Sequence, residues 1–247
     1  MILVSSFYQW SLFIGILLGL VQLARLAPKG STAAWLDTGL AVLLGALLGA
    51  RGVFVAASWP YFRAHPGDIL MISAGGLAWP GALGGAVLIV LGLAWAGRGN
   101  PGLVGDQLLP LALPVVVSLW LGCLGGGCFY GAAAPGSWWA LSSPDEWGRS
   151  LARLPLQVIG AAACLAVFAL VEVLRPRIRR PGQASSLAWF GLSAVLLGLS
   201  FLRADPEQVW HGWRLDSLAG LGFTGLSALA CAVCFWPRRK KSIKNRS

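Results

Sequence analysis

Seven apolar runs of about 20 residues each constrain the fold of this chain more than any other feature of its sequence. A helix needs roughly 20 apolar residues to cross a hydrocarbon core about 30 Å thick. The runs therefore predict an all-α polytopic membrane protein with about seven transmembrane helices. They cover Phe7–Ala27, Ala33–Ala57, Leu77–Gly97, Leu103–Cys123, Leu156–Leu174, Ser186–Leu202 and Leu215–Trp236.

The composition agrees with a membrane protein along the whole chain. Of 247 residues, 57% are hydrophobic and 11% are charged, whereas a soluble domain carries about 25% charged residues. No polar block is long enough to fold separately from the apolar runs. We therefore expect a single transmembrane domain over residues 1–247, in which residues 237–247 form a basic cytoplasmic tail.

The distribution of basic residues predicts the orientation of the chain. If the N-terminus lies outside, thirteen of the 19 Lys and Arg residues fall inside and five outside, while Arg51 lies within the second run. Because cytoplasmic loops hold an excess of Lys and Arg, we predict that the N-terminus is out and the C-terminus is in. The net charge of +10 thus arises from short loops and one tail, and we expect no nucleic-acid partner.

Metal and cofactor ligands are scarce in this sequence. The two histidines, His65 and His211, both fall in predicted outer loops, and no cluster of ligand-type residues accompanies them. The sequence contains neither a phosphate-binding loop nor a nucleophile elbow. We therefore expect no cofactor and no bound metal.

Glycines are concentrated in the stretch Trp120–Gly131, which reads W-L-G-C-L-G-G-G-C-F-Y-G. Each glycine in a helix costs about 1 kcal/mol relative to alanine, so this stretch is poorly suited to regular helix. Irregular backbone at membrane depth occurs where it is buried in protein or lines a cavity. We expect the backbone here either to bend sharply or to approach a ligand or another helix closely, and the stretch to form the wall of an internal site.

Four pairs of glycines have the spacing G-x-x-x-G, which lets the backbones of two membrane helices touch. Such pairs are common in membrane helices and by themselves indicate packing rather than chemistry. The pairs are Gly15/Gly19, Gly45/Gly49, Gly81/Gly85 and Gly122/Gly126.

Three arginines, Arg51, Arg153 and Arg203, lie at the predicted outer ends of three helices. An ionisable residue inside a membrane run, as Arg51 is, indicates a functional site by default. Because arginine binds phosphate through two parallel hydrogen bonds, the three could hold a phospholipid head group. The alternative is that they are ordinary interfacial anchors.

The five cysteines leave two interpretations open. Cys231-x-x-Cys234 lies in an apolar run, where the two side chains are expected to pack as small hydrophobic groups. Cys123 and Cys128 lie towards the oxidising side and could form a disulfide. A membrane thiol-redox protein that uses this pair is one hypothesis for the function of the chain.

Five motifs occur in the same order and spacing as in one known family. They are G-A-R-G-V-F-V around Arg51, G-G-L-A-W-P-G-A-L-G-G at Gly75–Gly85, L-G-C-L-G-G-G-C-F-Y-G at Leu121–Gly131, R-L-P-L-Q at Arg153–Gln157 and F-L-R-A-D-P at Phe201–Pro206. From about Gly45 to the last helix the chain resembles the prolipoprotein diacylglyceryl transferase family.

The resemblance implies an enzyme of the bacterial inner membrane that moves a diacylglyceryl group from phosphatidylglycerol to the lipobox cysteine of a prolipoprotein. It implies phosphatidylglycerol, prolipoprotein signal peptides and membrane lipids as partners. It also implies a set of substrate-binding residues that match the motifs of the family. These are Arg51, Gly76, Gly81, Tyr130, Gly131, Arg153, Gln157 and Arg203.

The chain departs from the family pattern at six positions that carry polar or charged groups in the family. Pro80 replaces a histidine, and Trp120 replaces a lipid-binding arginine. The other replacements are Ile159 and Gly160 for Tyr-Glu, and Leu196 and Ser200 for Arg and Glu. We therefore assign no catalytic residue, and a non-catalytic lipid- or lipoprotein-binding membrane protein is the alternative hypothesis. Only His65 and Arg63 lie near enough in sequence to stand in for a lost base.

Overall fold

The structure is a computed structural model that describes residues 2–72, 75–145, 147–207 and 209–236. Within these residues, seven helices are long and apolar enough to cross a membrane, which confirms the predicted all-α polytopic fold. The seven helices are α1 (Ile2–Leu26), α2 (Thr32–Ala57), α4 (Trp79–Leu93, extended by the π-helical turn η3, Ala94–Arg98), α5 (Pro101–Gly126), α6 (Leu156–Leu174), α7 (Gln183–Ser200) and α8 (Leu215–Phe235).

The remaining elements are short and lie between the long helices. They are α3 (Trp59–Ala64), the 3₁₀ turns η1 (Pro66–Leu70) and η4 (Arg175–Arg177), and the two antiparallel hairpins β1 (Leu141–Pro144) with β2 (Ser150–Arg153) and β3 (Val209–Trp210) with β4 (Trp213–Arg214). The predicted basic tail, residues 237–247, lies outside the described residues.

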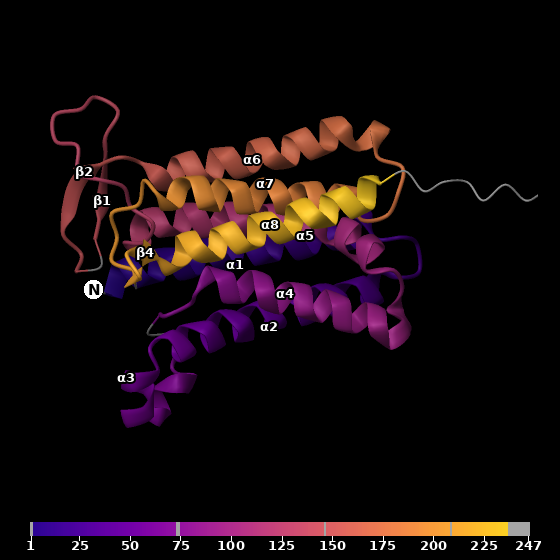
Figure 1. Cartoon of the computed structure of the whole chain (residues 1–247), viewed down its shortest axis with the longest axis horizontal. Coiled ribbons are helices and arrows are strands. Elements are labelled where there is room, and N and C mark those ends of the chain that lie inside the picture. The colour runs from indigo at the N-terminus through magenta and orange to yellow at the C-terminus, as the bar shows by residue number, and fades with distance from the viewer. Residues whose placement is uncertain (1, 73–74, 146, 208, 237–247) are drawn as a thin grey trace, which may run out of the picture.

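The long helices lie side by side, and the start of α1 and the end of α8 are at opposite ends of the bundle (Figure 1). Both hairpins and α3 lie at the end where α1 starts (Figure 1), which we call the hairpin end. α2 pairs with α4, α1 with α5, and α7 with α8, while α6 packs against α5 and α7. An odd number of spans puts the two ends of a chain on opposite faces of a membrane, and the outward orientation of the N-terminus remains a prediction.

The glycine pairs lie where helices approach most closely. A Cβ atom on Gly49 would collide with the carbonyl oxygen of Gly81, and one on Gly85 would collide with that of Gly45. The two G-x-x-x-G pairs of α2 and α4 thus face each other across one helix contact. The predicted packing role of these pairs is confirmed.

The fourth helix is longer than the sequence predicts. α5 continues through the glycine-rich stretch to Gly126 and ends at Gly127, whose φ of 71° is left-handed. Before Gly127 the stretch does not bend, and its glycines instead allow close approach to another helix, the second of the two alternatives that the sequence offered. A Cβ atom on Gly125 would clash with the ring of Phe7, and one on Gly122 would press against Tyr8. Contact with α1 compensates for the low helix propensity of these glycines.

Buried hydroxyl groups join α7 to α8. Ser193 and Ser227 are hydrogen-bonded at 3.0 Å between their Oγ atoms, and Ser200 and Ser217 at 2.9 Å. Hydrogen bonds between side chains of neighbouring helices contribute to association where no water competes. The two pairs fix the relative height of the two helices.

One carboxylate of α5 caps the beginning of α7. The Oδ2 atom of Asp106 accepts a hydrogen bond from the backbone N–H of Gly182, and its Oδ1 atom accepts one from that of Ser185, both at 2.7 Å. The first N–H groups of a helix have no partner within the helix, and a negative charge there is favourable. The cap ties the start of α7 to a helix 76 positions earlier in the chain.

Replacement of Gly49 by leucine should destabilise the protein, because the added side chain has to displace the backbone of α4. Overpacking of this kind costs typically 1–3 kcal/mol, so we expect the melting temperature in detergent to fall by about 5 °C. Gly92→Leu on α4 is the matched control, since a Cβ atom at Gly92 meets no atom within 4 Å. Equal melting temperatures for the two variants would contradict the assigned helix contact.

Candidate functional site

The side chain of Arg51 lies near the hairpin end of α2 and is 7% exposed. Each of its five N–H groups donates a hydrogen bond to a different backbone carbonyl of the segment that follows α3. The five acceptors are the carbonyl oxygens of Ile69 at 2.9 Å from Nε, Gly75 at 2.7 Å and Gly76 at 3.1 Å from Nη1, and Asp68 at 2.5 Å and Met71 at 3.3 Å from Nη2.

Two aromatic rings enclose the same guanidinium group. The ring centroids of Phe54 and Phe62 lie 5.6 and 5.3 Å from its central carbon, within the range of cation–π attraction. Among the described residues, no carboxylate lies within 4.0 Å of the Arg51 nitrogens. Carbonyl dipoles and ring faces therefore stabilise this charge, and Arg51 organises the loop that covers it.

A cavity of about 240 Å³ adjoins Arg51. One wall contains Gly76, whose φ of 80° favours glycine and where a Cβ atom would collide with Phe54 and lie 2.8 Å from Nη1 of Arg51. A side chain at this position would fill part of the cavity. The lining residues are Arg51, Phe54, Tyr61, Phe62, Asp68, Met71, Gly75 and Gly76.

Two polar residues of this cavity, Tyr61 and Asp68, are not among the predicted site residues. The hydroxyl of Tyr61 donates a hydrogen bond of 2.6 Å to Oδ2 of Asp68. This bond and the carboxylate charge raise the pKa of Tyr61 above its ordinary value. The ring of His65 stacks on that of Tyr61 with centroids 4.8 Å apart. The sequence did offer a signal for these two residues, because an aromatic residue and an acid occur together in the short loop that follows the run containing Arg51.

A second group of predicted site residues lies around the segment that follows α5. The backbone of Gly131 pairs with that of Arg203, and that of Ala133 pairs with Arg153. The guanidinium of Arg153 stacks on the ring of Tyr130 at 4.2 Å and lies 3.7 Å from Oδ2 of Asp145. The Nε atom of Arg153 is buried and has no hydrogen-bond partner in the described part of the chain.

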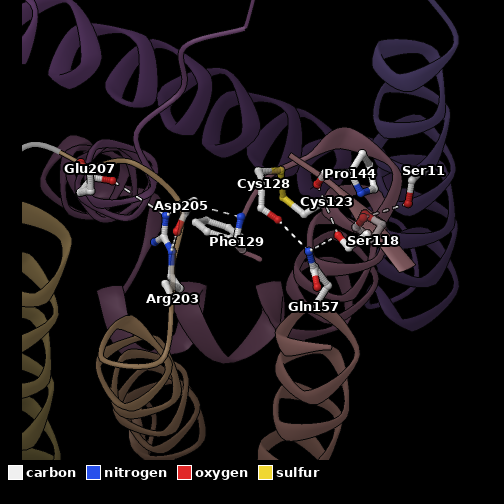
Figure 2. Close-up of a disulfide and its surroundings, with 11 residues drawn as sticks. Ser11, Ser118, Cys123, Cys128, Phe129, Pro144, Gln157, Arg203, Asp205 and Glu207 are labelled. Carbon is white, nitrogen blue, oxygen red and sulfur yellow. Dashed lines mark hydrogen bonds and ion pairs between the residues drawn. A yellow bond between two sulfur atoms is a disulfide. The ribbon is translucent and has the colours of Figure 1, made fainter. Parts of the chain in front are cut away.

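Carboxylates hold Arg203 on three sides, as Figure 2 shows in part. It binds Asp205 through two hydrogen bonds of 2.8 and 2.5 Å, and Asp216 through one of 2.6 Å. Glu207 is 3.8 Å away, and the guanidinium lies 4.1 Å from the centroid of the Phe129 ring. This arginine is therefore neutralised by the protein itself.

The structure contains a disulfide between Cys123 and Cys128, which answers the question that the sequence left open. The bond joins the last turn of α5 to the segment that carries Phe129 and Tyr130 (Figure 2). Gln157 is fully buried and donates from Nε2 to the carbonyl oxygen of Cys128 at 3.0 Å and to Oγ of Ser143 at 3.2 Å. Its Oε1 atom has no partner among the described atoms.

The structure thus arranges the predicted site residues in two groups rather than one. Arg51, Gly76 and Gly81 belong to α2, α4 and the loop between them, and the cavity contains none of the others. Gly81 itself lies in the contact between α2 and α4. The second group comprises Tyr130, Gly131, Arg153, Gln157 and Arg203. Within the described residues, no group of three or more His, Cys, Asp or Glu side chains could hold a metal ion.

Trp120 lies in an apolar cluster beneath the second group. Its buried indole packs directly against Gly160, where a Cβ atom would collide with the ring. Leu156 and Leu199 belong to the same cluster, and Leu196 packs against it. The side chains at these positions pack in the apolar core of the helix bundle.

The chain is similar to proteins of one known family over almost its whole length. The family model described as prolipoprotein diacylglyceryl transferase matches residues 3–236. The chain is 32% identical over 219 residues to a phosphatidylglycerol–prolipoprotein diacylglyceryl transferase of Rhodospirillum centenum, covering 83% of this chain and 78% of the relative. It is 27% identical to the protein of the same name from Azospirillum brasilense (84% and 80% covered) and 30% identical to that of Symbiobacterium thermophilum (82% and 78% covered).

Substitution of Arg51 by lysine should loosen the loop over the cavity although the positive charge is kept. A lysine offers three donors without the planar fork, so at least two of the five carbonyl oxygens lose their partner. We expect a loss of about 2 kcal/mol in the stability of this region. Hydrogen–deuterium exchange of peptides from Pro66–Ile72 measures it, and Arg63→Lys on the exposed side of α3 is the control. Unchanged exchange in Arg51→Lys would refute the organising role.

Replacement of Cys123 by serine should lower the stability of the protein by on the order of 2 kcal/mol, since the disulfide closes a short loop. Thermal unfolding in detergent with and without reductant measures this difference. Cys231→Ser removes one of the free cysteines and is the matched control. If reductant lowered the melting temperature of Cys123→Ser as much as that of the wild type, the stabilisation would not come from this bond.

Proposed function

Because this chain belongs to the prolipoprotein diacylglyceryl transferase family, we propose that it acts on phosphatidylglycerol and transfers its diacylglyceryl group to the cysteine of a prolipoprotein. The family match extends over residues 3–236, which include all seven membrane-spanning helices. The relatives carry phosphatidylglycerol and prolipoprotein in their names.

The cavity beside Arg51 is the observation that carries the proposal. The cavity wall contains a buried guanidinium that no described carboxylate pairs with directly and, apart from it, the carboxylate of Asp68. The Arg51 side of the cavity therefore favours the phosphate of a lipid head group, although the formal charge of the whole lining is zero. Since the five N–H groups of Arg51 bind carbonyls, the side chain contributes charge and loop geometry rather than hydrogen bonds to phosphate. Its position near the hairpin end of a membrane helix suits a lipid in the leaflet at that end.

The proposed reaction makes one bond and breaks one. The cysteine thiol of the acceptor gives its proton to water, and the resulting thiolate attacks the carbon of the diacylglyceryl group that bears the phosphate. A C–S bond forms, the C–O bond to phosphate breaks, and glycerol phosphate leaves with the electron pair. The positive charge of Arg51 stabilises the negative charge that develops on the leaving group.

We assign the second group of residues to the prolipoprotein side of the site. Arg153 Nε and Gln157 Oε1 are a buried donor and a buried acceptor without partners among the described atoms. An unpaired buried polar group costs about 1–3 kcal/mol, so a substrate group that pairs with either atom gains that energy. The ring of Tyr130 contacts the guanidinium of Arg153, and the backbone of Gly131 pairs with that of Arg203.

We also propose that the protein lies in the bacterial inner membrane as a single transmembrane domain, with the hairpin end outside. A fluorescent protein fused after residue 247, so that the basic tail is kept, should then fluoresce, and an alkaline phosphatase fusion at the same position should be inactive. The opposite pair of results would contradict the N-out, C-in orientation predicted from the basic residues.

A second candidate function is binding of the same lipid or lipoprotein without transfer. The packing of Trp120 on Gly160 favours it, because both positions carry polar or charged groups in the family pattern. An apolar ring cannot stabilise a developing phosphate charge, and loss of one such stabiliser costs 10²–10³ in rate.

A transfer assay separates the two functions. Purified protein in micelles with phosphatidylglycerol is mixed with a lipobox peptide, and mass spectrometry detects the diacylglyceryl thioether. We expect the wild type to form the product and Arg51→Ala to reduce its rate at least tenfold, because the lipid site loses its charge and its loop. Arg175→Ala, which alters an exposed arginine at the other end of the bundle, is the control.

Absence of product with retained phosphatidylglycerol binding, beside an active relative under the same conditions, would replace transfer by the binding function. Absence of both product and lipid binding would refute the proposal as a whole.

A further inference from the structure

The cavity beside Arg51 offers hydrogen-bond acceptors and few donors. The five N–H groups of Arg51 bind backbone carbonyls, and the hydroxyl of Tyr61 donates to Asp68. What the lining presents to a ligand is therefore the carboxylate of Asp68 and the carbonyl oxygens that already bind Arg51. A carboxylate accepts hydrogen bonds and donates none. A ligand that fits must bring its own donors.

Hydroxyl groups and ammonium groups are the two donor classes found in lipid head groups, and the charge of the lining distinguishes them. The lining contains one cation, Arg51, and one anion, Asp68. An ammonium ion would lose its hydration and gain no net attraction from a wall whose formal charges sum to zero. A hydroxyl is far cheaper to remove from water. The balance of charge thus favours an uncharged polyol over ethanolamine.

The size and the other walls of the cavity suit a small polyol. Its volume of about 240 Å³ corresponds to roughly eight water molecules at about 30 Å³ each, which leaves room for a glycerol group. The rings of Phe54 and Phe62 and the side chain of Met71 provide apolar surface for C–H groups. The leftover space can hold water that completes the hydrogen bonds.

We propose that this cavity receives the glycerol head group of phosphatidylglycerol, and that Asp68, oriented by Tyr61, determines the preference for a polyol. The proposal rests on the proposed function and adds to it the residue that selects the head group. Asp68 acts in recognition of the lipid and takes no part in bond making or breaking.

The test compares lipids that differ only in the head group. Binding of phosphatidylglycerol, phosphatidylethanolamine and phosphatidic acid, which has the phosphate without the polyol, is measured by native mass spectrometry of protein released from mixed micelles. We expect the wild type to prefer phosphatidylglycerol over both. Asp68→Ala should lower the ratio of phosphatidylglycerol to phosphatidic acid about tenfold, because it removes charge-assisted hydrogen bonds.

Two further variants keep the result interpretable. Asp68→Asn retains an acceptor of the same shape without the charge and should lower the ratio about threefold. Asp37→Ala removes an exposed acid that lines a separate cavity beside Trp35 and Val104, and it should leave the ratio unchanged. The ratio is measured at about pH 5, where phosphatidic acid, like phosphatidylglycerol, carries a single negative charge, so general Coulomb effects of removing an acid largely cancel. Melting temperatures show whether each variant is folded.

Free glycerol separates the head group from the rest of the lipid. If the cavity recognises glycerol itself, excess glycerol should reduce binding of phosphatidylglycerol and spare that of phosphatidic acid. An equal effect on both lipids, or a ratio in folded Asp68→Ala within twofold of the wild type, would overturn the inference. Thioether formation with an unchanged ratio overturns only this inference, whereas loss of all lipid binding in the wild type overturns the proposed function.

Discussion

Close contact between helix backbones is the constraint on which this structure depends. Lipid tails are as apolar as leucine side chains, so helices in a bilayer associate through packing and hydrogen bonds rather than through the hydrophobic effect. Here the glycines of α2 face those of α4, and the end of α5 lies against α1 through Gly122 and Gly125. The two serine pairs and the Asp106 cap supply the hydrogen bonds. Because these contacts fix the helices, the loops at the hairpin end have a rigid base.

Three buried arginines at that end are stabilised in three different ways. Arg51 has carbonyl oxygens on every N–H group, Arg153 has a ring and one distant carboxylate, and Arg203 has two close carboxylates and a third farther away. The charge that remains available to a ligand therefore differs among them. It is greatest at Arg51, where no described acid is within ion-pair distance, and least at Arg203. The three arginines thus occupy similar positions at helix ends, but the protein neutralises their charges to different degrees.

Periodic features of the sequence predicted the fold well, but the sequence did not predict individual contacts between residues. The seven runs and the glycine pairs repeat a physical requirement of the bilayer over many residues, so their signal accumulates. The extension of α5 to Gly126 was missed because the contact with Phe7 that stabilises it joins residues far apart in the chain. The carbonyl cage of Arg51 and the role of Asp68 depend on backbone positions in one loop. The residue types in a short stretch of sequence do not determine where the backbone carbonyls of a loop point, so this geometry could not be predicted.

The packing of Trp120 on Gly160 also has a consequence for the history of the chain. While the indole is present, the backbone at position 160 admits no side chain, because even a Cβ atom would collide with the ring. Introduction of a side chain at position 160 would have to begin with a smaller residue at position 120 and pass through an intermediate with an open space in the core. Such cavities are destabilising in proportion to their volume. The two positions are therefore coupled, and the order in which they can be substituted is fixed by the ring of Trp120.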